Sequence, residues 1–310
     1  MTGDRDRSSD PNFERRAGRQ AVLFTGSVLV LCLGLSLALP HRELTPLIAA
    51  LLPTAAVAVT IPLTTPKGRR RAAWAAVSFR PPRFRYLLVA VALPVAVASA
   101  SFGIAAAIGA VHLTAPHLDD YWSVLINIAV TAVAFSLLFL GEEIGWRGYL
   151  LPRLAILMSG RRAAVATGAI HAVFHLPLLL LTTTYQSAGN RWIVVPAVLV
   201  TITLAGIPYA WLRWASGSIW PVAVMHAIFN DAMGRWTTIA VAASPAALAY
   251  TTTETGLVTV ALMIMLAALL LTAGRRTFEA GAQATRTQLR RLEDLPPTEH
   301  GRADALTTPG

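Results

Sequence analysis

The stretch WSVLINIAVTAVAFSLLFLGEEIGWRGYL, Trp122–Leu150, joins a long apolar run to a compact group of charges. The run Trp122–Leu140 has the length and composition of a membrane-spanning helix. A charged side chain at bilayer depth costs about 2.5–3.5 kcal/mol on insertion scales, so such residues are usually kept for a function. The sequence therefore predicts a spanning helix that ends in functional carboxylates.

The charges in this stretch have helical spacing. Glu143 and Arg147 are four residues apart, with the acid before the base, and can pair along one face. Glu142 lies about 100° around the helix from Glu143 and cannot share that partner. We expect Glu143 and Arg147 to neutralise each other while Glu142 stays available for chemistry. The alternative is a charge cluster at the membrane surface, solvated by lipid headgroups.

The composition is that of an integral membrane protein. The 310 residues are 55% hydrophobic and 14% charged, with a mean hydropathy of +0.57, whereas about a quarter of the residues of a soluble domain are charged. The net charge of +10 would suit nucleic acid. However, the basic residues lie between apolar segments, in the pattern of membrane topology signals, so we expect the lipid bilayer and no nucleic acid as partner. The single cysteine, Cys32, excludes an intrachain disulfide.

Eight apolar segments are each close to the roughly 20 residues that cross a bilayer. We expect an all-α bundle of about eight transmembrane helices. Its divisions are a disordered cytoplasmic tail (1–20), helices 1–3 (21–121), a core of helices 4–7 (122–241), a last helix (242–273) and a polar cytoplasmic tail (274–310). The segments are Ala21–Leu39, Thr45–Leu63, Tyr86–Ala110, Trp122–Leu140, Ala163–Leu181, Trp192–Trp211, Ile219–Val241 and Gly256–Ala273.

The distribution of positive charge predicts the orientation of the bundle. If both termini are cytoplasmic, the cytoplasmic segments carry all but three of the 26 Lys and Arg residues. The three exceptions are Arg42, Arg191 and Arg235. Because cytoplasmic loops carry an excess of Lys and Arg, we expect a multi-pass protein with both termini inside.

Polar pairs with helical spacing occur in two further apolar segments. His171 and His175 are one turn apart in the fifth, and His226 and Asn230 repeat the spacing in the seventh. At 1.5 Å rise per residue their depths are compatible, so they can meet Glu142 in one cytoplasm-facing cavity if the helices are neighbours. Carboxylate and imidazole groups suit activation of water, and Asn and His donors suit an oxyanion. Each residue can also serve only as a hydrogen bond between helices.

These residues resemble the motifs of the CPBP intramembrane proteases, the CAAX protease and bacteriocin-processing (Abi) family, which includes the type II CAAX prenyl endopeptidases. The resemblance covers about Trp122–Asp231. Glu142-Glu143-Ile-Gly-Trp-Arg147 matches the EExxxR motif, His175 matches the histidine that closes the second motif, and His226-Ala-Ile-Phe-Asn230 matches HxxxN.

The resemblance implies an intramembrane endopeptidase with a cavity open to the cytosol and a membrane-anchored peptide or protein as substrate. The family's abundance in bacteria and the arginine-over-lysine bias favour a bacterial plasma (inner) membrane. The alternatives are a non-enzymatic immunity or scaffold protein and a proton-coupled transporter, against which the lack of an internal repeat counts. The catalytic set implied is Glu142 and His175 for water activation, His226 and Asn230 for the oxyanion, with Glu143 and Arg147 beside them.

The chain departs from the family pattern at His171, where the second motif usually begins with Phe or Trp. The resulting HxxxH is a spacing seen in helical zinc sites, although the glutamate that follows the first histidine there is missing. Two interpretations stay open. Either His171 packs, which we favour, or Zn²⁺ is bound by ligands drawn from His171, His175, His226 and Glu142.

Overall fold

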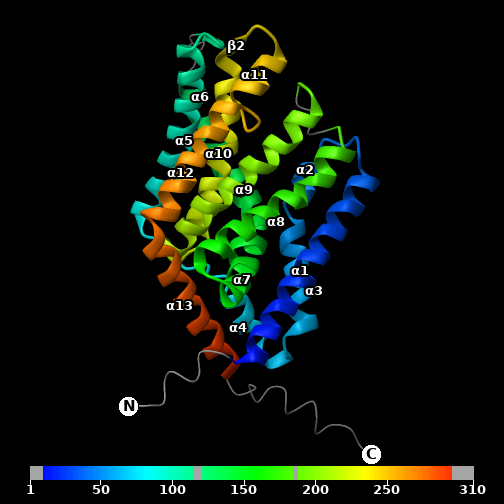
Figure 1. The fold of residues 1–310 in the computed structure, drawn as a ribbon. Helices are drawn as coiled ribbons and strands as arrows, with labels where there is room; N and C mark the ends of the chain where they lie inside the picture. Colours follow the sequence, from blue (N-terminus) through cyan, green and yellow to red (C-terminus); the bar gives the residue numbers. More distant parts are fainter. Residues whose placement is uncertain (1–9, 115–120, 184–187, 295–310) are drawn as a thin grey trace, which may run out of the picture.

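The computed structural model describes residues 10–114, 121–183 and 188–294. Nearly all of them are helical, and the strands β1 (Val111–Leu113) and β2 (Ala240–Ala242) form one antiparallel pair. The all-α membrane fold predicted from the sequence is confirmed (Figure 1).

The long helices run up and down the bundle in alternation, and the first described helix begins and the last one ends at the same end of the molecule, called here the end of the termini (Figure 1). Short helices and turns connect them. The helices are α1 (Pro11–Ala38), α2 (Thr45–Ala49), α3 (Leu52–Thr64), η1 (Lys67–Arg69), α4 (Arg70–Ala75), α5 (Phe84–Ala107), α6 (Tyr121–Glu143), η2 (Ile144–Leu150), α7 (Leu151–Leu157), α8 (Gly160–Leu181), α9 (Arg191–Ser216), α10 (Trp220–Ile239), α11 (Pro245–Thr251), α12 (Leu257–Thr272) and α13 (Arg275–Asp294).

The number of spans differs from the predicted eight. Among the described residues, 6 helices are long and apolar enough to cross a membrane, or 7 if α12 and α13, bent by 65°, count as one span. The segment that does not qualify is α10, a helix of 20 residues. Its hydropathy is lowered by His226, Asn230, Asp231 and Arg235. The polar residues of α10, which include two of the predicted site residues, thus make the helix too polar to qualify as a span.

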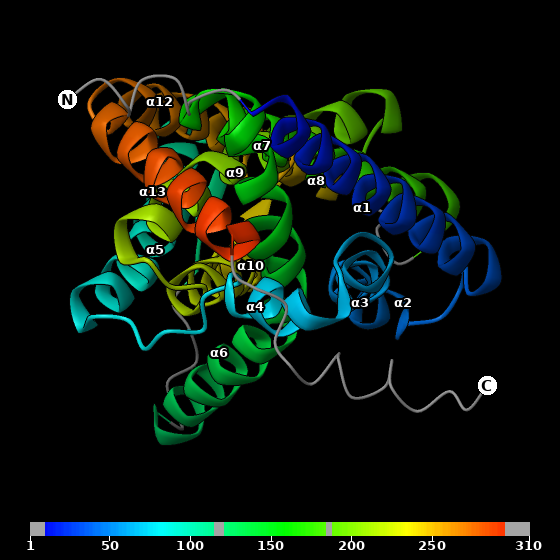
Figure 2. The ribbon, with the colours of Figure 1, turned by 90° about the horizontal axis from the view of Figure 1, so that it is seen from below.

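Both predicted tails contain helix. Helix α1 begins at Pro11 and Asp10 caps it by accepting a hydrogen bond from the backbone N–H of Asn12 at 2.9 Å. Residues 11–20 are therefore helical and not disordered, while residues 1–9 lie outside the described part of the chain. Residues 275–294 form α13, which buries Phe278 and Leu289. Seen from the end that holds the termini, α13 lies across the bundle close to α7 and α9 (Figure 2).

Helices α8 and α9 cross at two glycines. A Cβ atom on Gly168 would lie 2.3 Å from the carbonyl oxygen of Thr203, and one on Gly206 would lie 2.6 Å from the Cα of Gly168. Real Cβ atoms do not approach other atoms this closely, so the crossing requires glycine. The contact holds the histidine-bearing helix α8 directly against α9.

The segment after α6 is a π-helix, η2, and it packs against α3 and the residues after α4. Gly145 and Gly148 make this possible, because a Cβ on either would lie 2.4 Å from Pro53 and 2.6 Å from Val77, respectively. A π-turn widens the helix and changes the direction of its side chains, and such turns are frequent at functional sites. Here it follows directly after Glu142 and Glu143.

We predict that Gly168→Ala destabilises the bundle. The added methyl group overpacks the α8–α9 crossing, which typically costs about 1–3 kcal/mol. Gly103→Ala is the matched control, since Gly103 is an exposed glycine in α5 with nothing within 4 Å of a built Cβ. Thermal unfolding in detergent should show a lower melting temperature for Gly168→Ala alone. Equal melting temperatures would mean that the crossing relaxes around the methyl group.

Candidate functional site

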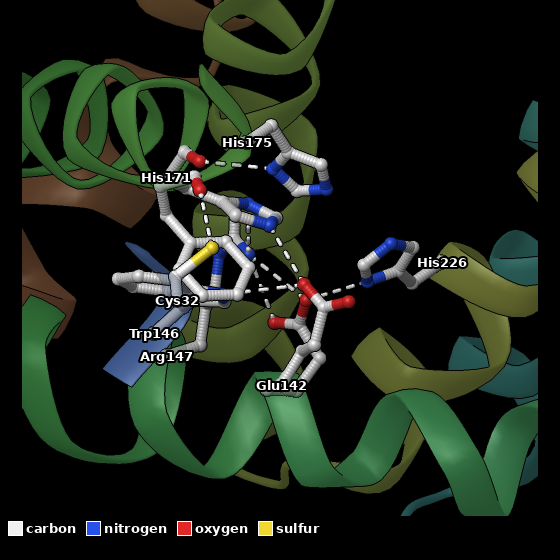
Figure 3. A network of polar contacts seen from close by, with 9 residues as sticks. Cys32, Glu142, Trp146, Arg147, His171, His175 and His226 are labelled. Carbon is white, nitrogen blue, oxygen red and sulfur yellow. Dashed lines mark hydrogen bonds and ion pairs between the residues drawn. The ribbon is translucent and has the colours of Figure 1, made fainter. Parts of the chain in front are cut away.

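Four elements bring their polar side chains together in the centre of the bundle (Figure 3). Glu142 and Glu143 end α6, η2 follows them, α8 carries His171 and His175, and α10 carries His226. All five of these side chains are buried. The predicted meeting of these three helices is therefore observed.

The ion pair predicted between Glu143 and Arg147 is present. Arg147 Nη1 donates to Glu143 Oε1 at 2.9 Å and to Oε2 at 3.2 Å, and both side chains are completely buried. Glu143 Oε1 also accepts from His226 Nδ1 at 2.9 Å. The guanidinium lies 4.9 Å from the centre of the Tyr209 ring. Glu143 therefore links η2 to α10, which sequence spacing did not indicate.

Glu142, expected to stay available for chemistry, is held by partners of its own. His171 Nε2 lies 2.8 Å from Glu142 Oε2, and Trp146 Nε1 donates to the same oxygen at 3.3 Å. Glu142 also lines a cavity. Its carboxylate is thus held by two donors while it faces the space in which a ligand can bind.

His171 does more than the packing that the sequence favoured. Its ring stacks on Trp146, with 4.8 Å between ring centres. Nε2 faces the Glu142 carboxylate at 2.8 Å, and Nδ1 lies 3.4 Å from Arg147 Nη1. A carboxylate can only accept and a guanidinium can only donate, so the ring carries its proton on Nε2 and its lone pair on Nδ1. His171 is a polar link between Glu142 and Arg147.

His175 has the other tautomer. Its Nδ1 lies 3.1 Å from the backbone carbonyl oxygen of His171, which can only accept, so the proton is on Nδ1. In the neutral ring the lone pair is then on Nε2. A histidine held in this way is oriented for use as a base or as a metal ligand.

The ligand atoms of Glu142, His171 and His175 lie within 4.8 Å of one another. Two histidines and a glutamate are a donor set of catalytic zinc. His226 is not part of this group and instead holds Glu143. The tautomer of His171 fits a metal poorly. The ring nitrogen that faces Glu142, Nε2, carries the proton and so has no lone pair to give to zinc. Moving that proton to Nδ1 would set two donors, His171 and Arg147, against each other.

Three aromatic residues belong to the site although the sequence analysis gave them no role. Trp146 lies inside the EEIGWR stretch and contacts both Glu142 and His171. Phe139 and Tyr209 stack on His226, with 4.3 Å and 5.3 Å between ring centres. Trp146 could have been suspected from its place in the motif. Phe139 and Tyr209 lie in apolar stretches of α6 and α9, where no local signal marks them.

A cavity of about 1030 Å³ leads from these residues to the surface. Asn230 is exposed and lines this cavity together with Glu142 and His226. The cavity reaches α11 and the start of α9, at the end of the bundle away from the termini (Figure 1). Cytoplasmic termini and a cytoplasm-facing cavity, both expected from the sequence, are therefore incompatible.

The comparisons with known proteins point to one family. Residues 122–232 match the family described as "Type II CAAX prenyl endopeptidase Rce1-like". The matched region begins and ends within a residue of the resemblance inferred from the motifs, so the predicted relationship is confirmed. No curated protein matches the chain.

We predict that Glu143→Gln lowers the stability of the protein strongly. The substitution leaves Arg147 buried without a counter-charge, and breaking a buried ion pair typically costs about 3–5 kcal/mol. Glu293→Gln is the control, because it removes the partner of Arg16 in a largely exposed pair, which typically contributes about 0–1 kcal/mol. Melting curves in detergent measure both. A Glu143→Gln protein as stable as the control would contradict the structural importance of the pair.

Proposed function

From the membership of residues 122–232 in the Rce1-like family of type II CAAX prenyl endopeptidases, we propose that this chain is an intramembrane endopeptidase. It hydrolyses a peptide bond of a membrane-associated substrate with a water molecule activated by Glu142. The observation that carries the proposal is the buried Glu142 carboxylate, which faces a cavity and is grouped with His171 and His175.

Glu142 acts as the general base. A water molecule donates one hydrogen bond to the carboxylate and a second to the lone pair on His175 Nε2, so its oxygen points into the cavity. Transfer of a proton to Glu142 accompanies attack of the water oxygen on the carbonyl carbon. Glu142 then gives the proton to the amide nitrogen, the C–N bond breaks, and the carboxylate is regenerated.

His226 and Asn230 stabilise the oxyanion of the tetrahedral intermediate. Both residues line the same cavity as Glu142. The Asn230 amide donates through its NH₂ group. His226 donates through Nε2 when the ring is protonated, since Glu143 accepts from Nδ1. Donors held in place before the charge develops can stabilise a transition state by about 2.7–4 kcal/mol each.

Glu143 and Arg147 position this machinery. Arg147 Nη1 contacts Glu143 and His171, and Glu143 contacts His226. The ion pair therefore fixes one histidine on each side of the site. Removing the ion pair would therefore disturb both His226, which stabilises the oxyanion, and His171, which contacts the general base Glu142.

Zinc is the alternative cofactor. Bound by Glu142, His171 and His175, it would polarise the carbonyl group and lower the pKa of its water. The tautomer of His171 favours the metal-free reaction, and the donor set favours the metal. Metal content decides between them.

We predict that Glu142→Gln abolishes hydrolysis and leaves the fold nearly intact. The substitution removes the proton acceptor but keeps the volume and one oxygen that can accept from His171. Glu43→Gln, an exposed carboxylate outside the cavity, controls for the loss of charge. Cleavage of a panel of membrane-tethered peptides, with melting temperature measured in parallel, provides the test. Equal cleavage by wild type and Glu142→Gln would remove Glu142 from the mechanism.

We predict that His171→Phe lowers kcat about 10–100-fold, the range typical of removing a hydrogen-bond partner that orients a side chain in a metal site, with KM nearly unchanged. Phenylalanine keeps the stack on Trp146 but loses the hydrogen bond to Glu142. In the metal-free reaction, elemental analysis finds no stoichiometric zinc in active wild type, and chelators do not inhibit. One zinc per wild-type chain that disappears in His171→Phe would establish the metal site instead.

A further inference from the structure

The cavity connects the buried site with the end of the bundle that carries α11. Its inner wall holds Glu142, His175 and Thr201, all buried. Its outer rim holds Thr183, Ala188 and Arg191, all exposed, at the end of α8 and the start of α9. The mouth therefore lies beside α11, at the end opposite the chain termini (Figure 1).

The other end of the site is closed. On the side of the termini, Glu142 and Glu143 are followed by η2, whose Trp146, Tyr149 and Leu150 side chains are completely buried. Phe24 packs on two of these rings, at 5.6 Å from the Trp146 centre and 5.4 Å from that of Tyr149. A substrate approaching from the side of the termini would have to displace this aromatic packing.

The two ends of the bundle also differ in charge. Among the described residues, basic side chains gather at the starts of α1 and α8, in η1 and α4, before α5, and along α13, all at the end of the termini. The mouth end carries only Arg42, Arg191 and Arg235 of the described Lys and Arg residues. An excess of Lys and Arg marks the cytoplasmic side of a membrane protein, and each such residue near an anionic leaflet gains about 1 kcal/mol.

We propose that the cavity takes its substrate from the non-cytoplasmic side of the membrane. If the proposed hydrolysis holds, the substrate is a polypeptide segment that lies outside the cytoplasm, such as the outer end of a membrane-anchored peptide. If the arginine-rich end faces the cytoplasm, the mouth of the cavity lies on the outer surface of the membrane. The cytosol-facing cavity implied by the family resemblance does not apply to this chain.

The lining of the cavity suits an extended apolar peptide. Val194, Val198 and Leu179 form a buried apolar wall. Thr201, also buried, has a side-chain oxygen without a hydrogen-bond partner in the described structure. A hydroxyl in an apolar wall can satisfy one backbone group of a bound peptide, which would otherwise be desolvated without a partner.

The direction of the mouth can be tested without any activity. Single cysteines replace Ala188 at the rim and Arg162 at the opposite end, both exposed, in a Cys32→Ala background. A membrane-impermeant maleimide applied to intact cells should label Ala188→Cys as fully as in opened cells. Arg162→Cys should be labelled only after the cells are opened. The reverse pattern overturns the proposal, and it leaves the proposed hydrolysis untouched.

A second experiment asks whether the mouth is the route to the site. In the purified protein, a bulky maleimide on Ala188→Cys should abolish cleavage of the tethered peptides, while the same adduct on Arg162→Cys should leave the rate unchanged. Full activity of the Ala188 adduct would show that substrate enters elsewhere. Loss of hydrolysis in Glu142→Gln, measured separately, keeps a failure of this route distinct from a failure of the proposed function.

Discussion

A buried charge pair, Glu143 with Arg147, is the constraint on which the rest of the structure depends. Both side chains are inaccessible to solvent, and taking two charges out of water is repaid only when their geometry is good and their remaining groups find partners. Three neighbours contact the pair from different directions: His226 from α10, His171 from α8 and the Tyr209 ring from α9. Arg147 Nε and Nη2 have no hydrogen-bond partner in the described part of the chain, so these few contacts and the ion pair itself hold the helices that form the site.

The glycines of the bundle serve the same requirement. Gly206 of α9 lies beside the Arg147 guanidinium, where a Cβ would be in ordinary contact with Nη2 at 3.4 Å, and it meets Gly168 more closely, where a Cβ would lie 2.6 Å from the Gly168 Cα. Gly168 allows α8 to touch α9 at the same level. Small residues let helices approach closely in membranes, where hydrophobic burial contributes little to helix association. The Glu143–Arg147 pair and the glycines at the α8–α9 crossing therefore act together to hold these helices close.

Local patterns in the sequence predicted what depends on local physics. Apolar length predicted the helices, and i, i+4 spacing predicted the Glu143–Arg147 pair, which is observed. The partners of Glu142 and the direction of the cavity depend on which helices touch, and no single segment encodes this. Helix α13 was taken for a tail because its mean composition is polar, although it buries Phe278 and Leu289 along one face.

His171 shows why the packing and polar interpretations of one residue need not exclude each other. Its ring occupies the place of the aromatic residue usual in the family and stacks on Trp146, so the packing of that position is kept. Its Nε2 adds a donor for Glu142 and its Nδ1 an acceptor for Arg147. A phenylalanine here would leave the Glu142 carboxylate with Trp146 as its hydrogen-bond donor within the described structure. The histidine therefore connects the ion pair that holds the bundle to the carboxylate that faces the cavity.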